Sequence, residues 1–423
     1  MNILKLLLVV CVLLVGCGLS QDLPPELISS TDSPEPPEAT MRVFTPAPTA
    51  TIPVISNNKS ITSVEKNCVN LQDEPLPPAI MNGSVFFVSD SENQRNFYWN
   101  AGTNETYPFL EDDSPPGIRI NNLIQSPNRQ WLAYQKKFFD VDGNYLRGTY
   151  VVIDSKSQIV AEINQDKRGE VLREWLDNER LLIQGSYDFD YGTSIIANPF
   201  TQQAEILSPN LPNLYDEHPP AFWPPFYNLD LSKVIYPHGP IKGELGYVYM
   251  DLQTGNILWR QASNGAAHIP PKWSPDRAEF ALILYKQDIF GEEEREIMIF
   301  DNSGQKIIQT NLEANYSTVF FGNDDSVQWS PDKQYIALWL LATNDDLEIG
   351  GRPSLTVLDL QEKKMIDFCI SGYANGDDIV WAPDGRYFIT WSDKDMTNIL
   401  IDVVEKKIFR LPAPGRIRFW LRE

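Results

Sequence analysis

A short motif recurs along the chain and restricts the folds that the sequence can adopt. Its clearest copies are residues 273–276 and 329–332, both Trp-Ser-Pro-Asp, and residues 381–385, Trp-Ala-Pro-Asp-Gly. Each copy stands between short segments rich in aliphatic and aromatic residues, which favour β-strands. Proline presets φ for a turn, and Asp can accept hydrogen bonds from the turn amides. The motif therefore predicts two strands joined by a tight turn, with structural roles for its Trp, Pro and Asp.

Three weaker copies complete a regular series, and the one at residues 227–230 is the most degenerate. The aromatic-equivalent positions are 125, 175, 227, 273, 329 and 381, so neighbouring copies lie 46 to 56 residues apart. A second pair of strands joined by a polar turn is predicted after each copy. Four strands in about 50 residues make up one blade of a β-propeller. We therefore expect an all-β propeller.

The two ends of the repeat region complement each other. Residues 84–110 contain three predicted strands but no opening motif, whereas residues 416–421 form an opening strand with Trp420 in the aromatic position and no successor. If the last strand completes the first blade, the ring closes without an unpaired sheet edge. The sequence thus predicts seven four-stranded blades, with a closing blade shared between the N-terminal and C-terminal strands.

Over about residues 80–423, the repeat resembles the WD40-like (PD40) repeat of the TolB-type propellers. The resemblance implies a propeller that is used for binding. The α/β domain that precedes the propeller in TolB is not visible in this sequence, and a Pro-rich segment stands in its place. TolB's own partners are therefore not carried over.

The N-terminus is typical of an exported lipoprotein. Lys5 precedes an apolar run at 6–15, which is too short to span a bilayer, since a spanning helix needs about 20 residues. Residues 14–17, Leu-Val-Gly-Cys, resemble the bacterial lipobox, which implies cleavage after a signal peptide of residues 1–16 and lipidation of Cys17. The alternative is an ordinary secretory peptide with a chance cysteine. We expect an exported protein, lipid-anchored to the bacterial cell envelope at the outer face of a membrane or in an outer membrane.

Residues 17–66 are rich in Pro, Ser and Thr and show no apolar period. Such a composition cannot bury enough surface to offset the entropy of ordering. The sequence therefore predicts a disordered tether over 17–66 and a propeller domain over 67–423.

Two cysteines, Cys68 and Cys369, remain after the signal peptide and Cys17 are set aside. An even number of thiols in an oxidising compartment permits one disulfide. Cys68 precedes the first predicted strand of the folded part, and Cys369 lies in a predicted blade strand. The bridge would tie the end of the tether to the rim of the propeller. The alternative is two separate thiols.

The formal net charge of −22 disfavours nucleic acid and anionic membrane surfaces as partners, because both are polyanions. We expect a monomer that contacts the membrane only through its lipid. The sequence contains no nucleophile elbow, no His-Glu-x-x-His zinc motif, no phosphate-binding Gly-rich loop and no Cys-x-x-Cys pair. No cofactor is expected, apart from a weak Ca²⁺ candidate.

Acidic residues gather in the predicted loops between the second and third strands of most units. In a four-stranded meander these loops share one face with the blade-to-blade connections. That face would attract a protein or other cationic ligand, or Ca²⁺ at Asp140 and Asp142. The alternative is a set of solvated hairpin tips. The further candidates for the binding face are Asp188, Asp190, Glu292, Glu293, Glu294, Asp345, Asp346, Asp393 and Asp395.

Two functions of different classes follow. The first is a non-enzymatic binding or scaffold propeller, displayed on the envelope and binding through the acidic loops. The second is a propeller enzyme acting on carbohydrate, which would need paired carboxylates near the central channel. A substrate-capture lipoprotein beside a transporter is less well supported, because the predicted fold is not the usual hinged one.

Overall fold

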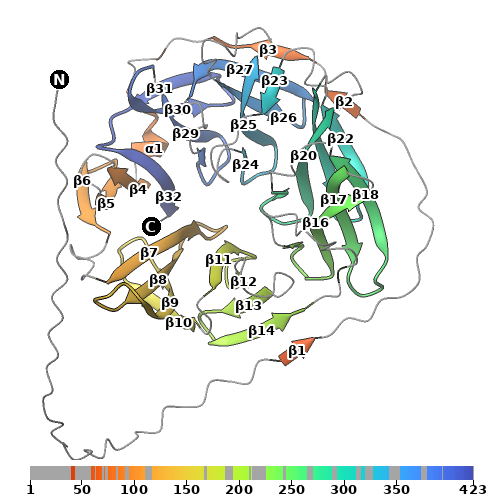
Figure 1. Ribbon diagram of the computed structural model, residues 1–423. Coiled ribbons are helices and arrows are strands. Elements are labelled where there is room, and N and C mark those ends of the chain that lie inside the picture. The colour runs from red at the N-terminus through yellow and green to blue at the C-terminus, as the bar shows by residue number, and fades with distance from the viewer. Residues whose placement is uncertain are drawn as a thin grey trace, which may run out of the picture. The chain divides into compact units, whose positions relative to one another are not determined.

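Strands make up almost all of the regular structure in the computed structural model (Figure 1). The one helix among the described residues is α1 (Pro78–Met81), and no described helix is long and apolar enough to cross a membrane. The structure describes residues 40–42, 59–61, 63–68, 71, 75–81, 84–90, 95–109, 117–165, 169–185, 194–208, 211, 225–241, 244–263, 270–287, 293–310, 316–319, 327–342, 353–372, 379–392 and 394–422.

The strands form seven sheets arranged as the blades of a β-propeller. Each blade is built on a four-stranded antiparallel meander whose first strand lies toward the middle of the ring and whose fourth strand lies at the rim (Figure 1). This confirms the predicted fold class.

The strands of each blade are given with the innermost first. Blade 1 contains β32 (Arg416–Arg422), β4 (Ser84–Asp90), β5 (Arg95–Asn100) and β6 (Glu105–Pro108), and blade 2 contains β7 (Ile118–Gln125), β8 (Leu132–Phe139), β9 (Tyr145–Ile153) and β10 (Ile159–Gln165). Blade 3 contains β11 (Glu170–Trp175), β12 (Leu181–Gly185), β13 (Ser194–Asn198) and β14 (Gln203–Leu207), and blade 4 contains β15 (Phe226–Tyr227), β16 (Lys233–Ile241), β17 (Glu244–Asp251) and β18 (Ile257–Ser263).

Blade 5 contains β19 (Lys272–Trp273), β20 (Glu279–Gln287), β21 (Glu293–Asp301) and β22 (Lys306–Thr310). Blade 6 contains β24 (Val327–Trp329), β25 (Tyr335–Ala342), β26 (Ser354–Asp359) and β27 (Lys364–Ser371). Blade 7 contains β28 (Val380–Trp381), β29 (Tyr387–Ser392), β30 (Thr397–Asp402) and β31 (Lys407–Leu411). A further strand, β23 (Tyr316–Val319), pairs with the distal half of β25.

The recurring motif builds the turn between the first and second strands of a blade. In blade 5 the Ser274 hydroxyl donates to Asp276 (2.8 Å) and accepts from the Glu279 amide (3.0 Å). Blade 6 repeats these bonds at Ser330 and Asp332. The fifth position of the motif has a left-handed φ in five blades, at Arg129, Leu231, Arg277, Lys333 and Gly385. The motif therefore has the structural role that the sequence predicted.

Motif residues also bond neighbouring blades together. The indole of Trp329 donates to the Lys272 carbonyl (3.0 Å), and that of Trp381 donates to the Gln328 carbonyl (3.1 Å). Between the turns, Lys333 forms an ion pair with Asp276 at 2.6 Å. Burial alone would raise the pKa of Asp276, but the Lys333 ammonium and the Ser274 hydroxyl hold it below its usual value.

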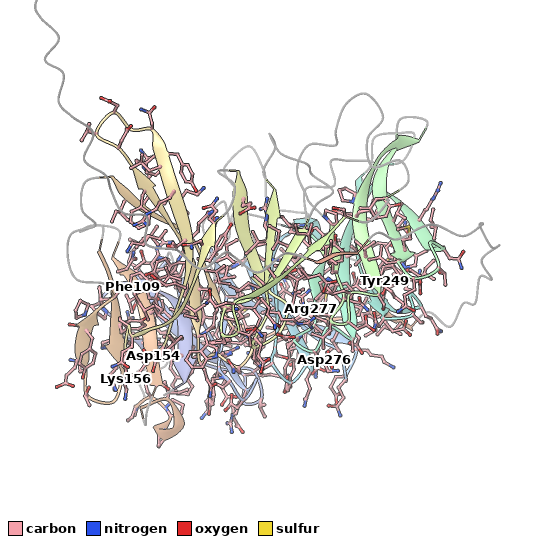
Figure 2. All side chains as sticks on the ribbon, turned by 90° about the horizontal axis from the view of Figure 1, so that it is seen from below. Phe109, Asp154, Lys156, Tyr249, Asp276 and Arg277 are labelled. Carbon is pink, nitrogen blue, oxygen red and sulfur yellow. A yellow bond between two sulfur atoms is a disulfide. The ribbon has the colours of Figure 1, made fainter. Side chains whose placement is uncertain are left out.

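An Asn or Asp side chain holds the turn between the third and fourth strands of each blade. In every blade an Asn or Asp is the last residue of the third strand or directly follows it, and its side chain accepts amide hydrogen bonds from the turn that comes next. Figure 2 shows Asp154, one of these residues, toward the same side of the ring as the motif residue Asp276. These side chains, five carboxylates and two amides, hold turns. The seven residues are Asn100, Asp154, Asn198, Asp251, Asp301, Asp359 and Asp402.

The ring closes as the sequence predicted. The C-terminal strand β32 pairs antiparallel with β4, with Trp420 opposite Phe86 and Leu421 opposite Val85. The Trp420 side chain is buried, and its ring centroid lies 4.8 Å from that of Phe86. The Gln125 amide of blade 2 donates to the Trp420 carbonyl (2.7 Å), so the closing strand is also fixed to the next blade.

The segment predicted to be a disordered tether contributes three strands to the rim, and this corrects the boundary at residue 67. β1 (Thr40–Arg42), β2 (Lys59–Ile61) and β3 (Val64–Lys66) pair in parallel with the outer strands β14, β22 and β27. Sequence periodicity missed them because each is three residues long and is held mainly by backbone hydrogen bonds to an open sheet edge.

We call the described residues between 59 and 81 the belt, because they pass along the rims of blades 5 and 6 and continue to blade 1 (Figure 1). Ile61 is fully buried, and Glu65 forms ion pairs with Lys364 (3.4 Å) and with Lys406 of blade 7. The predicted disulfide is present: Cys68 is bonded to Cys369 of β27, with a Cα–Cα distance of 4.9 Å.

Candidate functional site

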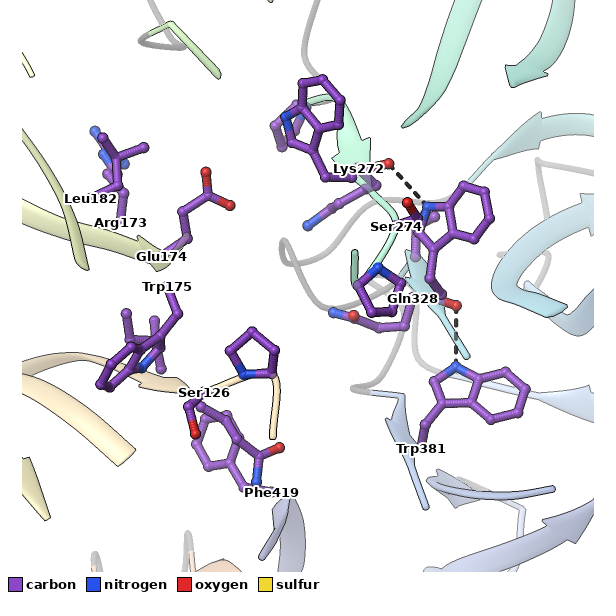
Figure 3. A pocket seen from close by; sticks show the side chains of 18 of the residues that line it. Ser126, Arg173, Glu174, Trp175, Leu182, Lys272, Ser274, Gln328, Trp381 and Phe419 are labelled. Carbon is purple, nitrogen blue, oxygen red and sulfur yellow. Dashed lines mark hydrogen bonds between the residues drawn. The ribbon is translucent and has the colours of Figure 1, made fainter. Parts of the chain in front are cut away.

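A cavity of about 510 Å³ lies where the innermost strands of all seven blades converge (Figure 3). Every blade contributes to its wall at least one of the two residues that precede its motif-aromatic position. Blade 1 contributes Arg418 and Phe419, blade 3 contributes Arg173 and Glu174, and blade 5 contributes Lys272. The motif turns supply Ser126 and Ser274 at one end. We call this cavity the central channel.

The inner strands of three consecutive blades are irregular at the channel wall. The register of β32 shifts between Ile417 and Phe419, and that of β11 shifts between Leu172 and Glu174. The residues left out of the pairing are Arg418 and Arg173, each two positions before a motif Trp. In β7 the shift falls between Asn121 and Ile124. Such β-bulges re-aim side chains and occur often beside binding sites.

The bulge in blade 2 is supported by buried polar side chains. Asn122, which has a φ of 52°, donates to the Gln135 side chain (3.2 Å). The Gln135 amide in turn donates to the Gln165 side chain (2.9 Å) and to the Glu170 carbonyl (2.7 Å). Because Gln135 is fully buried and satisfied, this network holds the bulged backbone of β7 in one position.

Among the described residues of the channel wall, basic side chains outnumber acidic ones. Its described wall carries five basic residues and one acidic residue, whereas the whole chain has a formal net charge of −22. The acidic residue is Glu174, whose carboxylate forms an ion pair with Arg277 at 2.8 Å. The basic residues are Arg129, Arg173, Lys272, Arg277 and Arg418.

Arg277 links three blades at the motif-turn end of the channel. It belongs to blade 5, and its buried guanidinium donates to the carbonyls of Tyr227 in blade 4 (2.8 Å) and Trp175 in blade 3 (2.9 Å). Together with the ion pair to Glu174, these bonds occupy most of its donors. Arg277 is therefore a structural cation that also neutralises the one described acid of the wall.

Aromatic rings lie between the charged residues of the wall. Trp175, Trp329 and Trp381 are buried in the blade cores, whereas Trp273 and Phe419 are only partly buried. Trp273 packs edge-on against Phe280 with a centroid distance of 4.9 Å. Phe419 packs against Phe87 at 5.7 Å. Partly exposed rings held in this way offer apolar surface to a ligand.

The proposed Ca²⁺ site at Asp140 and Asp142 is a hairpin turn. The Asp140 carboxylate accepts bonds from the Asn144 amide (2.7 Å), the Asn144 side chain (3.0 Å) and the Asp142 amide (2.9 Å). The Asn144 bonds hold the pKa of Asp140 below its usual value. In the described part of the chain, no group of three acidic, His or Cys side chains is placed to hold a metal.

Few of the acidic binding-face candidates can be compared with the structure. Asp395 is half-buried and accepts a bond from the Ser392 hydroxyl (2.8 Å). The backbones of Glu293 and Glu294 lie in β21, opposite Gln287 and Lys286. The other candidates, Asp188, Asp190, Glu292, Asp345, Asp346 and Asp393, lie outside the described residues, as does the lipidation candidate Cys17.

The basic channel wall was missed by sequence reasoning. Its charges are contributed singly by strands about 50 residues apart, so no basic run marks them. A sequence signal was nevertheless present at one position of the repeat. An arginine stands two residues before a motif Trp at both Arg173 and Arg418. Only the ring brings these positions to one cavity, and only the bulges give the two arginines their common irregular geometry.

No protein-family model matches the chain, and no curated protein matches it. Solved structures of similar fold include the β-propeller domain of the Trilobed protease from Pyrococcus furiosus, with 12% identity, 71% of this chain and 85% of that chain covered, and a TM-score of 0.43. Oligogalacturonate lyase from Vibrio parahaemolyticus is 11% identical, with 78% of this chain and 86% of that chain covered and a TM-score of 0.43. Hydrazine synthase from Kuenenia stuttgartiensis is 12% identical, with 69% of this chain and 80% of that chain covered and a TM-score of 0.40. Likeness at this level concerns the fold alone.

Proposed function

We propose that this protein is a non-enzymatic binding module displayed at the bacterial cell envelope, and that its ligand occupies the central channel. The observation that supports this proposal is the cavity of about 510 Å³ to which every blade contributes wall residues. Small-molecule sites commonly have volumes of about 300–1,000 Å³ and combine apolar rings with a few polar groups. The channel wall has this composition.

The wall is also rigid, which favours binding because a preformed site needs little ordering. The strands that carry the wall residues are fixed by the indole bonds of Trp329 and Trp381 and by Arg277. The Gln125 bond to the Trp420 carbonyl holds the closing blade in the same way. A ligand would therefore meet side chains presented from a closed ring.

Display at the envelope rests on Cys17 as the lipidation site and on residues 1–16 as the signal peptide. The Cys68–Cys369 disulfide supports export, because disulfides persist mainly in oxidising compartments. Binding of a protein or cationic partner through the acidic loops stays a prediction.

The alternative function, carbohydrate chemistry, requires two carboxylates about 5–10 Å apart in the channel. Among the described wall residues Glu174 is the one carboxylate, and it is paired with Arg277. A second acid would have to come from residues outside the described ranges. The geometry therefore favours binding over acid–base catalysis at this wall.

Filling the channel tests the proposal. The Gln328 side chain lies at the channel wall (Figure 3), so Gln328→Trp places a large ring in the cavity. Gln253→Trp is the matched control, because Gln253 is exposed in a turn of blade 4. Ligand-observed NMR with small molecules from the native envelope should show binding to wild type and to Gln253→Trp, and loss of binding in Gln328→Trp.

Two results would count against the proposal. Equal binding by both variants would place the ligand elsewhere. Chemical conversion of the bound compound by the wild-type protein would replace a binding module with an enzyme. We expect the compound to be recovered chemically unchanged from the wild-type protein, and the Trp introduced at position 328 to prevent its binding.

A further inference from the structure

We infer that the outer part of the β8–β9 hairpin in blade 2 is a docking surface for an acidic segment of a partner protein. This surface comprises residues 136–147 together with Arg119 of the neighbouring strand β7. We call it the blade 2 tip. The described wall of the central channel includes none of these residues. The inference therefore concerns a second surface and does not depend on the ligand of the channel.

The hairpin extends beyond the packed part of blade 2. Residues 132–135 of β8 and 150–153 of β9 are buried, whereas residues 136–147 are exposed or half-buried. Asp154, at one end of β9, lies on the motif-turn side of the ring (Figure 2), and the hairpin turn lies at the other end of β9. The Asp140 carboxylate fixes this turn through its three hydrogen bonds. A fixed hairpin with accessible sides needs little ordering when it binds.

Three cations of the blade 2 tip lie over phenyl rings. On one face of the hairpin, the ring centre of Phe138 lies 4.5 Å from the Arg147 guanidinium carbon and 5.3 Å from the Lys136 ammonium nitrogen. On the other face, the Arg119 guanidinium carbon lies 4.7 Å from the ring centre of Phe139. Successive side chains of a strand point to opposite faces, so each face presents a cation that is held by a ring.

These cations are accessible to a partner. Arg119 and Arg147 are exposed, and Lys136 is half-buried. Among the residues that the structure describes, no carboxylate forms an ion pair with any of the three. The acid of the turn, Asp140, accepts its bonds from the turn itself. A guanidinium stacked on a ring keeps its in-plane N–H groups for two-point hydrogen bonding to a carboxylate.

Apolar side chains accompany the cations. Val141 is fully exposed in the turn, and Leu146 is exposed at the start of β9. Leu146 is also the residue left out of the pairing where the register of the two strands shifts, and such bulges re-aim side chains. Protein interfaces combine Arg and aromatic residues with apolar contacts in this way. The surface therefore fits a segment that carries carboxylates beside apolar side chains.

A bilayer, a polyanion and a second copy of this chain fit the surface less well. Asp140 and Asp142 flank Val141, so the turn would bring acids to an anionic membrane surface. The net charge of −22 repels extended polyanions. A second copy would meet the tip through a different part of itself, and such head-to-tail contacts form filaments unless they close into a ring.

Fluorescence anisotropy of labelled synthetic peptides, titrated with the full chain, tests the inference. The probe is a short peptide of alternating Glu and Leu, and its matched control has Gln in place of every Glu. We expect the Glu peptide to bind at least about tenfold more tightly than the Gln peptide, with an affinity that falls as salt is raised. Equal binding of the two peptides, or no binding of the Glu peptide, would overturn the inference.

Variants locate the binding. Arg119→Gln and Arg147→Gln should each weaken the Glu peptide by about fivefold or more, because a charge-assisted hydrogen bond is lost. Arg410→Gln, on the exposed side of β31, is the matched control. Val141→Ser should also weaken binding, whereas Val404→Ser, at an exposed position in a turn of blade 7, should not. Thermal melts establish that each variant folds. Unchanged binding by the Arg119→Gln/Arg147→Gln double variant would contradict the inference.

Further measurements decide between the classes of partner. Phosphatidylglycerol vesicles and dextran sulfate replace the peptide as probes, and preference for either, lost in the double variant, would overturn the inference in favour of a membrane or a polyanion. Sedimentation of the protein alone that shows self-association, again lost in the double variant, would identify a second copy as the partner and would equally overturn it. Gln328→Trp should bind the Glu peptide as wild type does, because the channel is not involved.

Discussion

Arg277 and Glu174 form an ion pair of 2.8 Å that joins blade 5 to blade 3 at the end of the central channel. The same guanidinium donates to two backbone carbonyls, on Trp175 and Tyr227. The contact fixes three blades and neutralises the one described carboxylate of the channel wall. Both the stability of the ring and the charge of the cavity therefore depend on Arg277.

Removing this guanidinium should strongly destabilise the ring. Arg277→Ala leaves two carbonyls and the Glu174 carboxylate without their partner, which costs about 3 kcal/mol or more for a buried network. Urea unfolding measures the loss. The exposed Lys156, which Figure 2 shows near a turn, provides the control Lys156→Ala. A loss below about 1 kcal/mol for Arg277→Ala would mean that the three blades are held by other contacts.

Two features favour glycine at position 385: its left-handed backbone conformation and the close approach of the Asp332 side chain. Gly385 has a φ of 75°, and an added Cβ would lie 2.6 Å from the Asp332 carboxylate carbon. Asp332 is pinned by Ser330 (2.6 Å) and by the Gln334 amide (3.1 Å). Gly143 is the matched control, with a φ of 81° and open space around it.

Both Gly→Ala variants should therefore lose about 1 kcal/mol from backbone strain, and Gly385→Ala should lose about 1–3 kcal/mol more from the clash. Thermal or urea unfolding of the two variants gives the difference. Equal losses would show that Asp332 moves aside and that the turns of blades 6 and 7 are not tightly packed.

Loss of the closing strand should be among the most damaging changes. Trp420→Ala removes a buried ring from the core between blades 7 and 1, at a cost of about 3–5 kcal/mol. Deletion of residues 415–423 also exposes the edge of β4 and should lower the melting temperature further. Deletion of residue 423 alone is the control. An unchanged melting temperature after the longer deletion would contradict closure by β32.

The Cys68–Cys369 disulfide should protect the belt. It joins positions 301 residues apart, and bridges that close long loops typically stabilise by about 2–4 kcal/mol. The double variant Cys68→Ser/Cys369→Ser should therefore unfold at lower urea and show faster proteolysis near residue 68. Intact-mass analysis after alkylation checks the bond itself. Two alkylated thiols at these positions in unreduced protein would disprove it.

The belt should also weaken in acid. Hydrogen bonding and charge from Lys406, aided by Lys364, lower the pKa of Glu65 below its ordinary value of 4.5. A lowered folded-state pKa gives stability that is fully present above 4.5 and is lost as the pH falls through the folded value. Because the pair is well exposed, Glu65→Gln should cost only about 0.5 kcal/mol at pH 7.

The difference between wild type and Glu65→Gln should be smaller at pH 3 than at pH 7, whereas the exposed Glu362→Gln should differ little from wild type at either pH. Urea midpoints at both values give the comparison. A Glu65→Gln deficit of the same size at pH 3 and pH 7 would show that its carboxylate charge does not hold the belt.

The blades could be predicted because each motif copy contains its own turn chemistry. Even the degenerate copy at 227–230 keeps an Asn and an Asp that bond the turn, since Asp230 accepts from Ser232 and Asn228 accepts from the Lys233 amide. Closure followed from the position of Trp420. By contrast, β1, β2 and β3 leave no sequence signal, because backbone bonds to a sheet edge are available to almost any side chain.

The channel could not be predicted for a different reason. The acidic loops were visible as local runs, whereas Arg173, Lys272 and Arg418 are isolated cations in separate strands. Their common location depends on closure of the seven-bladed ring, and the setting of Arg173 and Arg418 depends on bulges that change the register by one residue. Sequence analysis therefore identified the abundant acidic residues and missed the few basic residues of the channel wall.

A crystal structure of the protein bound to the compound that ligand-observed NMR identifies tests the central claim most directly. Binding in the central channel predicts electron density for the compound beside Gln328 and Trp273, and no such density in Gln328→Trp. Density confined to the outer rim or to lattice contacts, with an empty channel at saturating compound, would contradict the account.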